Sequence, residues 1–138
     1  MSNKITRSIH TIVVTFNRKI LLAACLKKLL AQNADFEYLI VVNNASTDGT
    51  EAYIQEAGLL DHKKIIWLNL PENIGGAGGF NIGFKEVVEN CDADWLVCYD
   101  DDAYPQSGSI TKFKSLTLNQ SVGSIASAVY LPDGKIAE

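Results

Sequence analysis

Four short, mostly apolar runs recur along this chain, the first of them rich in β-branched residues, and each has the length of a strand rather than of a helix. The segments between them carry apolar residues at helical spacing or residues that begin and end helices. The predicted strands are 9–16, 38–42, 64–68 and 95–99, and the predicted helices are 18–32, 50–57 and 79–90. This alternation predicts an α/β fold, Rossmann-like in type, with a mostly parallel sheet covered by helices on both faces.

The pattern weakens after Pro105. Residues 107–118 have weak helical spacing, residues 122–131 predict a strand, and Pro132-Asp133-Gly134 predicts a turn. Such a turn predicts a returning strand, yet the sequence stops at Glu138. We therefore expect residues 1–138 to be a single domain that is the N-terminal part of a larger one, truncated at its C-terminus.

Polar residues gather where each predicted strand ends. In a parallel sheet these ends lie on one edge, and ligands bind beyond that edge. Four polar clusters on one edge are more typical of a binding site than of four independent loops. The clusters are Thr15-Phe16-Asn17, Asn43 to Asp48, Pro71 to Gly79, and Asp100 to Asp102.

The acidic triplet after the fourth strand carries the strongest chemical signal. In an extended segment Asp100 and Asp102 point in one direction and Asp101 points in the other. Two carboxylates at this spacing repel each other, and a bound cation turns that cost into a binding site. Ions such as Mg²⁺ are held by one or two carboxylates together with substrate phosphates. A metal–phosphate ligand is one interpretation, and a solvated aspartate turn that caps the next segment is the other.

A glycine-rich segment, PENIGGAGGFNIG, precedes the third predicted helix. Glycines there let the backbone approach a ligand closely, and a helix N-terminus favours anions. The spacing does not match a dinucleotide fingerprint, because Asn81 stands where a third glycine is needed, and no P-loop Gly-Lys-Ser/Thr is present. A connector required for tight helix–sheet packing is the alternative.

Side chains after the first two strands offer polar and aromatic contacts. Asn43 and Asn44 carry amides that can hydrogen-bond a base edge or ribose hydroxyls. Asp48 can do the same, although helix capping is the favoured role for Thr47 and Asp48. Phe16 either stacks on a base or fills the core.

Composition and charge exclude several classes of protein. A chain of 138 residues with 47% hydrophobic residues can build one core, and it carries a net charge of −4 with a pI near 5.1. No basic block is present, which argues against nucleic acid as a partner. The sequence lacks a 20-residue apolar span and a signal-peptide core, so we expect a cytoplasmic protein.

The cysteines and histidines are predicted to be structural. Cys25, Cys91 and Cys98 are widely spaced and lie in or beside apolar stretches, so we expect buried, reduced thiols. His10 opens a strand and His62 lies in a polar loop, which favours structural or solvated roles for both.

Taken in order, VVTFNR, VVNNASTDGT, ENIGGAGGFNIG and WLVCYDDDAYP resemble the nucleotide-binding half of inverting family 2 glycosyltransferases with a GT-A fold. The ENIGGAGGF form most resembles the bacterial branch that contains galactofuranosyl- and rhamnosyl-transferases. The resemblance covers about residues 11–105, and the motifs are specific as a set rather than singly.

The resemblance implies a role for each motif. The residues implied to line the nucleoside pocket or contact base and ribose are Thr15, Phe16, Asn17, Asn43, Asn44 and Asp48. The residues implied to lie near the donor are Gly75, Gly76, Gly78, Gly79 and Asn81. Asp100 and Asp102 match the outer residues of a D-x-D motif that holds Mn²⁺ or Mg²⁺ on the diphosphate, and Asp101 is implied to orient the ribose or sugar.

The implied activity is metal-dependent transfer of a sugar, with inversion, from a UDP- or dTDP-sugar to an acceptor hydroxyl of a glycan or lipid-linked molecule. Cell-surface polysaccharide or glycoconjugate synthesis is the implied setting. A homo-oligomer is compatible with the sequence, and association with the inner face of a membrane is expected only through regions outside this chain.

Two departures from the family pattern affect these assignments. Asn43 replaces a frequent aspartate, which leaves the preferred base open, and Ile82 stands where a basic residue is common. The catalytic base and a metal-binding histidine are expected beyond Glu138, so the isolated chain is expected to be inactive. A nucleotidyltransferase of related topology and a non-catalytic nucleotide-binding domain remain alternatives, although the former normally has a glycine-rich basic loop after its first strand.

Overall fold

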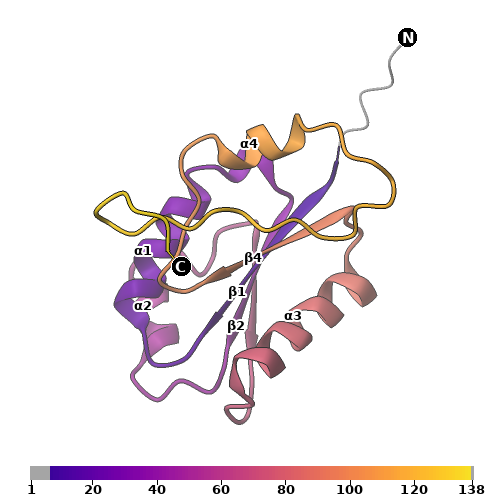
Figure 1. Ribbon diagram of the computed structural model, residues 1–138. Coiled ribbons are helices and arrows are strands. Elements are labelled where there is room, and N and C mark those ends of the chain that lie inside the picture. The colour runs from indigo at the N-terminus through magenta and orange to yellow at the C-terminus, as the bar shows by residue number, and fades with distance from the viewer. Residues whose placement is uncertain (1–6, 138) are drawn as a thin grey trace.

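A computed structural model describes residues 7–137 and contains a parallel sheet between two layers of helices (Figure 1). The strands are β1 (Ile9–Thr15), β2 (Tyr38–Asn43), β3 (Ile65–Asn69) and β4 (Trp95–Asp100). The helices are α1 (Lys19–Leu30), α2 (Thr50–Glu56), α3 (Gly75–Asn90) and α4 (Ser109–Lys114), with a 3₁₀ turn, η1 (Asn33–Asp35), after α1. The predicted elements are thus confirmed through β4, with boundaries that differ by only a few residues.

The four strands are all parallel and lie in the order β3-β2-β1-β4. Their register aligns the carboxyl ends, because Thr15 pairs with Asn43 and Asn43 pairs with Asn69. On the other side of β1, Val14 pairs with Asp100. The predicted α/β fold with a parallel sheet is confirmed, and the polar residues that follow the strands share one edge of the sheet.

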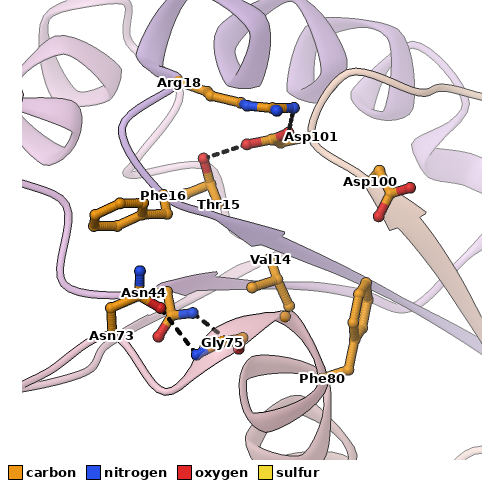
Figure 2. A pocket seen from close by; sticks show the side chains of 11 residues that line it. Val14, Thr15, Phe16, Arg18, Asn44, Asn73, Gly75, Phe80, Asp100 and Asp101 are labelled. Atoms are coloured by element: carbon orange, nitrogen blue, oxygen red, sulfur yellow. Dashed lines mark hydrogen bonds and ion pairs between the residues drawn. The ribbon is translucent and has the colours of Figure 1, made fainter.

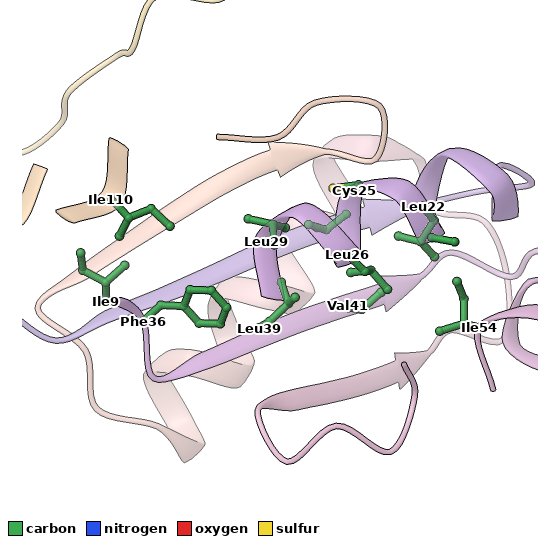
Figure 3. Close-up of a cluster of buried hydrophobic side chains, with 12 residues drawn as sticks. Ile9, Leu22, Cys25, Leu26, Leu29, Phe36, Leu39, Val41, Ile54 and Ile110 are labelled. Atoms are coloured by element: carbon green, nitrogen blue, oxygen red, sulfur yellow. The ribbon is translucent and has the colours of Figure 1, made fainter. Parts of the chain in front are cut away.

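Alternating side chains of the sheet build two hydrophobic clusters, one on each face. On the face covered by α1, α2 and α4, Leu22, Leu26 and Leu29 of α1 pack against β1 and β2 (Figure 3). On the opposite face, Ile12 and Val87 lie in the smaller cluster under α3. Both faces of β1 and β2 are therefore largely buried, which explains why these strands carry apolar residues at consecutive positions instead of alternating with polar ones.

Helix α3 begins at Gly75, four residues before the predicted start at 79. A Cβ atom at position 79 would lie 2.5 Å from Cγ1 of Val14, and one at position 83 would lie 2.7 Å from Cγ2 of Ile12. Only glycine permits this approach of α3 to β1. The helix therefore contains glycines despite their low helix propensity, because packing against β1 requires them.

The segment after β4 departs from the prediction. The predicted helix is shortened to α4, and the predicted strand at 122–131 is wrong. The predicted turn at 132–134 is present and is flanked by an isolated antiparallel bridge between Tyr130 and Ile136. Val129, Tyr130 and Leu131 are largely exposed, so this segment has no apolar surface in the described chain to hold it as a strand.

The three cysteines differ in burial although all are free. Cys25 is buried as predicted, Cys91 is half-buried, and Cys98 is exposed. The prediction was wrong for Cys98 because β4 lies at the edge of the sheet and is less covered than β1 and β2. His10 is buried with its ring edge-on to Tyr38, and Nδ1 of His62 accepts a bond from the backbone of Lys64. Within residues 7–137, the helices are all too short or too polar to cross a bilayer.

Candidate functional site

A cavity of about 330 Å³ opens at the carboxyl edge of the sheet, between the ends of β1 and β4 and the start of α3 (Figure 2). This volume is at the lower end of the range found for small-molecule sites. The lining residues are Val14, Thr15, Phe16, Arg18, Asn44, Asn73, Gly75, Gly76, Phe80, Asp100 and Asp101. Seven of these eleven belong to the sites predicted from the sequence, and they come from all four polar clusters.

Asn44 joins the end of β2 to the start of α3 on one side of the cavity. Its buried amide donates to the carbonyl oxygen of Gly75 at 3.0 Å and accepts from the backbone N–H of Ile74 at 3.0 Å. Gly75 and Gly76 form the first turn of α3, whose N–H groups have no partners within the helix. The positive end of a 16-residue helix dipole therefore faces the cavity, an arrangement that favours an anion.

Asp101 stands on the opposite side and is held by two partners (Figure 2). The hydroxyl of Thr15 donates to Oδ2 of Asp101 at 2.8 Å, and Nη1 of Arg18 lies 3.3 Å from Oδ1. The same Nη1 atom lies 3.0 Å from Oδ2 of Asp102. The Asp101 side chain is only 7% exposed, so these donors replace the water that its charge has lost.

The three aspartates do not continue the strand. β4 ends at Asp100, and the N–H of Ala103 bonds to the Asp100 carbonyl at 3.0 Å, so Asp101 and Asp102 occupy a turn. The predicted extended alternation of Asp100, Asp101 and Asp102 was therefore wrong. Asp100 lines the cavity apart from the Thr15–Asp101 pair (Figure 2). Asp102 contacts Arg18 and is not among the lining residues.

Cys25 of α1 contacts the turn formed by Asp100 to Ala103, which we call the acidic turn. Its thiol donates to the carbonyl oxygen of Ala103 at 3.1 Å and lies 3.8 Å from that of Asp100. Burial, together with the smaller effect of the charges of Asp101 and Asp102, raises the pKa of the Cys25 thiol from 9.0 to about 12. The thiol therefore keeps its proton and remains a hydrogen-bond donor at neutral pH. This role could not be predicted from the sequence, because Cys25 lies 75 residues from Asp100.

The carboxylates at this edge can bind a hard divalent cation only if a ligand such as a phosphate supplies further oxygen atoms. Oxygen ligands suit Mg²⁺ and Mn²⁺. Within residues 7–137, no group of three or more His, Cys, Asp or Glu side chains is placed to hold a metal ion. The fit is therefore to a cation held by one or two carboxylates, with phosphate oxygens completing its coordination.

Asn17 and Asp48 join the two loops beside the cavity instead of lining it. Asn17, at a left-handed φ of 54°, receives the N–H of Thr47 on its side-chain oxygen at 2.7 Å, and its own N–H donates to Ser46 at 3.0 Å. Asp48 accepts from the N–H of Lys19, the first residue of α1, at 3.4 Å. Asp48 thus contacts the first residue of α1, and its other oxygen accepts a bond from the hydroxyl of Thr50, the first residue of α2. The sequence suggested instead that Asp48 would cap the backbone of the helix that follows it.

Asn43 is also directed into the protein. Its amide nitrogen donates to Oδ1 of Asn69 at 3.0 Å, and its oxygen accepts from the N–H of Ser46 at 3.2 Å. Gly78 and Gly79 are absent from the cavity lining: Gly79 packs on β1, which supports the alternative of a packing connector. Asn81 is exposed on α3 and also lies outside the lining set.

The structure decides the environment of Phe16 and adds residues that the sequence did not single out. Phe16 lines the cavity and is 42% exposed, so it does not fill the core. The additional lining residues are Val14, Arg18, Asn73 and Phe80. Phe80 could have been found from its spacing, because it lies one helical turn after Gly76.

The family model described as glycosyl transferase family 2 matches residues 11–133 of the chain. The chain belongs to this family. The predicted resemblance to family 2 glycosyltransferases is thereby confirmed, and the match includes every polar cluster at the edge of the sheet.

Relatives of this family 2 chain include galactofuranosyltransferases. The galactofuranosyltransferase GlfT1 of Mycobacterium tuberculosis is 34% identical over 106 residues, which are 76% of this chain and 34% of the relative. GlfT1 of Mycolicibacterium smegmatis is 30% identical over 105 residues, or 76% of this chain and 33% of the relative. The chain therefore spans about a third of the length of the curated relatives it matches.

Solved structures identify the fold of this family 2 chain as GT-A. The mannosyltransferase PcManGT from Pyrobaculum calidifontis, in complex with GDP-Man and Mn²⁺, has a TM-score of 0.74 at 23% identity over 92% of this chain and 36% of that one. TarS 1–349 of S. aureus, in complex with UDP-GlcNAc, has a TM-score of 0.66 at 18% identity, covering 92% of this chain and 41% of that one.

Proposed function

We propose that this chain is the donor-binding part of a glycosyltransferase that moves a sugar from a nucleotide-diphospho-sugar to an acceptor hydroxyl, with inversion at the anomeric carbon. The observation that supports the proposal is the cavity itself, in which the N-terminus of α3 faces the acidic turn across the end of β1. A diphosphate with a divalent cation matches this pairing of a positive helix end with carboxylates.

Each side of the cavity has a role in this proposal. The backbone N–H of Gly76 donates to a phosphate oxygen, while the N–H of Gly75 bonds to Oδ1 of Asn73 at 2.9 Å. The exposed ring of Phe16 offers a stacking surface for the base. Asn44 keeps the α3 N-terminus in place. Asp100 and Asp102 would hold Mn²⁺ or Mg²⁺, which would stabilise the charge on the leaving diphosphate. Asp101, already bonded to Thr15 and Arg18, fixes the side of the cavity next to the ribose or sugar.

The acceptor side of the reaction is not assigned to residues 7–137. A base that removes the proton of the acceptor hydroxyl must lie within hydrogen-bonding reach of it. The buried carboxylate of Asp101 is engaged by Thr15 and Arg18, and Asp100 and Asp102 are assigned to the metal. We propose a further carboxylate outside this chain as the base. We also propose a glycan or lipid-linked acceptor and a location at the cytoplasmic face of a membrane.

Nucleotide titrations with and without metal test the proposal. UDP, dTDP and GDP are added to the chain in an isothermal titration calorimeter, with Mn²⁺ present or replaced by EDTA. We expect one of the three to bind only with Mn²⁺, and we expect Asp100→Asn and Asp102→Asn to abolish this binding.

Asp133→Asn is the matched control, because Asp133 is also an exposed aspartate with a cationic neighbour, Lys135, at 3.5 Å, but it lies in the turn at 132–134. We expect Asp133→Asn to bind like the wild type. Metal-independent binding, or binding that survives both aspartate substitutions, would contradict the proposal.

A further inference from the structure

One nitrogen atom connects the two carboxylates of the acidic turn. Nη1 of Arg18 lies 3.0 Å from Oδ2 of Asp102 and 3.3 Å from Oδ1 of Asp101. The two aspartates are held very differently. Asp101 is 7% exposed and also bonds to Thr15, whereas the Asp102 side chain is 50% exposed and has Arg18 as its partner among the described contacts. Asp102 is therefore the carboxylate that can be released at little cost, since exposed ion pairs are weak.

The positive charge of Arg18 lies at the N-terminus of a helix, which is electrostatically unfavourable unless carboxylates lie beside it. It is the N-cap residue of α1, whose first turn contains no acidic residue. The positive end of a helix dipole disfavours a cation, and the acidic turn offsets this. Arg18 also lines the cavity, on the side opposite Gly75 (Figure 2). A guanidinium that lost Asp102 would still be held at the cavity by Asp101.

We propose that Arg18 is a positioning residue that serves as the counter-ion of Asp102 in the metal-free protein and is exchanged for the divalent cation when the donor binds. The inference rests on the proposed function, because it assumes that Asp102 is a metal ligand. The cation and the guanidinium compete for the same Oδ2 atom. Once the cation holds Asp102, Arg18 remains bonded to Asp101 and directs its free donors towards the diphosphate.

If this exchange occurs, Arg18→Gln should raise the affinity for Mn²⁺ and lower the affinity for the nucleotide. Without nucleotide, the variant lacks the competing cation, so Mn²⁺ measured by electron paramagnetic resonance should bind about two- to five-fold more tightly, the range that corresponds to an exposed ion pair. With saturating Mn²⁺, the nucleoside diphosphate identified by titration should bind about ten-fold more weakly, the loss expected for a hydrogen bond to a charged group. A purely structural arginine would not produce opposite effects.

Lys135→Gln is the matched control, because Lys135 forms an exposed ion pair with Asp133 at 3.5 Å. We expect this variant to leave both affinities unchanged. Mn²⁺ binding by Arg18→Gln that equals or falls below the wild-type affinity, while the wild type binds metal and nucleotide, would overturn the inference and leave the proposed function intact. A wild type that binds no Mn²⁺ with any of the three nucleotides would overturn both.

If circular dichroism shows that Arg18→Gln does not fold, the exchange can be tested on the wild-type protein. The side-chain Nε–Hε signal of Arg18 in an NMR spectrum should move when Mg²⁺ is added, because its partner at Asp102 is replaced. An Arg18 signal that does not move at a Mg²⁺ concentration that saturates the site would overturn the inference.

Discussion

The hydroxyl of Thr15 donates a 2.8 Å hydrogen bond to Oδ2 of Asp101 and thereby joins the ends of β1 and β4, which are 86 residues apart in the chain. Both residues are buried. The bond fixes a charged side chain beside the cavity, so the position of the acidic turn depends on a residue of the central strand.

Replacing Thr15 by valine should destabilise the protein by about 1–3 kcal/mol, because a buried carboxylate loses one of its donors. Thr11→Val is the matched control. Thr11 lies on the same strand and face, is also buried, and makes a longer bond of 3.4 Å to the neutral carbonyl of Tyr38. In urea denaturation, the free energy of unfolding should fall clearly more for Thr15→Val than for Thr11→Val. Equal losses would show that the bond to Asp101 stabilises the protein no more than the bond to Tyr38.

Gly79→Ala should destabilise the protein by about 1–3 kcal/mol, since the added methyl group meets Val14 and pushes α3 from β1. Gly76→Ala provides the comparison, because a Cβ there meets no atom within 4 Å and alanine favours a helix. Thermal unfolding should therefore separate the two variants, with Gly76→Ala at or above the wild-type melting temperature. A Gly79→Ala protein as stable as Gly76→Ala would show that α3 can shift freely.

Acid stability should depend on Asp48. The hydrogen bond from the Thr50 hydroxyl, aided by the backbone N–H and charge of Lys19, holds the pKa of Asp48 below its usual value of 3.8. A carboxyl whose pKa is lower in the folded protein stabilises it above the unfolded pKa, and this stabilisation is lost as the pH falls through the folded pKa.

The free energy of unfolding of the wild type should therefore fall as the pH drops below about 4, and Asp48→Asn should show a shallower fall. Thr50→Val, which removes the main donor, should act in the same direction. Denaturant titrations from pH 5 to pH 2 measure this dependence. If the free energy of unfolding of Asp48→Asn falls with pH in parallel with that of the wild type, Asp48 is not the cause of the fall.

The sequence predicted the sheet well because the strands are encoded locally, by runs such as Ile9 to Thr15 whose apolar character reflects burial on both faces. It missed the first turn of α3 because Gly75, Gly76 and Gly78 have low helix propensity. The requirement for glycine at position 79 was also not visible locally, because it is set by Val14 in a distant strand. The strand predicted at 122–131 failed for the opposite reason: its residues are apolar, but they remain exposed in the described chain.

In the candidate site too, features encoded by local sequence were predicted and features set by distant residues were not. Thr15, Asn44 and Asp100 were predicted because they directly follow or end strands, and the topology brings such positions together. Arg18 was not singled out, because its partners lie 83 and 84 residues away and its neighbours in the sequence give no sign of them. The direction of Asp102 was predicted wrongly because the chain turns directly after Asp100 instead of remaining extended through the triplet.

The central place of β1, between β2 and β4, has a consequence for redesign. One face of this strand carries residues of the larger hydrophobic cluster and the other carries residues of the cluster under α3, so a change within it disturbs two layers at once. The connections that follow β2 and β3 contribute Asn44 and Asn73 from outside the strands. A library that aims to alter ligand preference should therefore diversify those connections, with the exception of the buried Asn44 that holds the start of α3, and keep β1 constant.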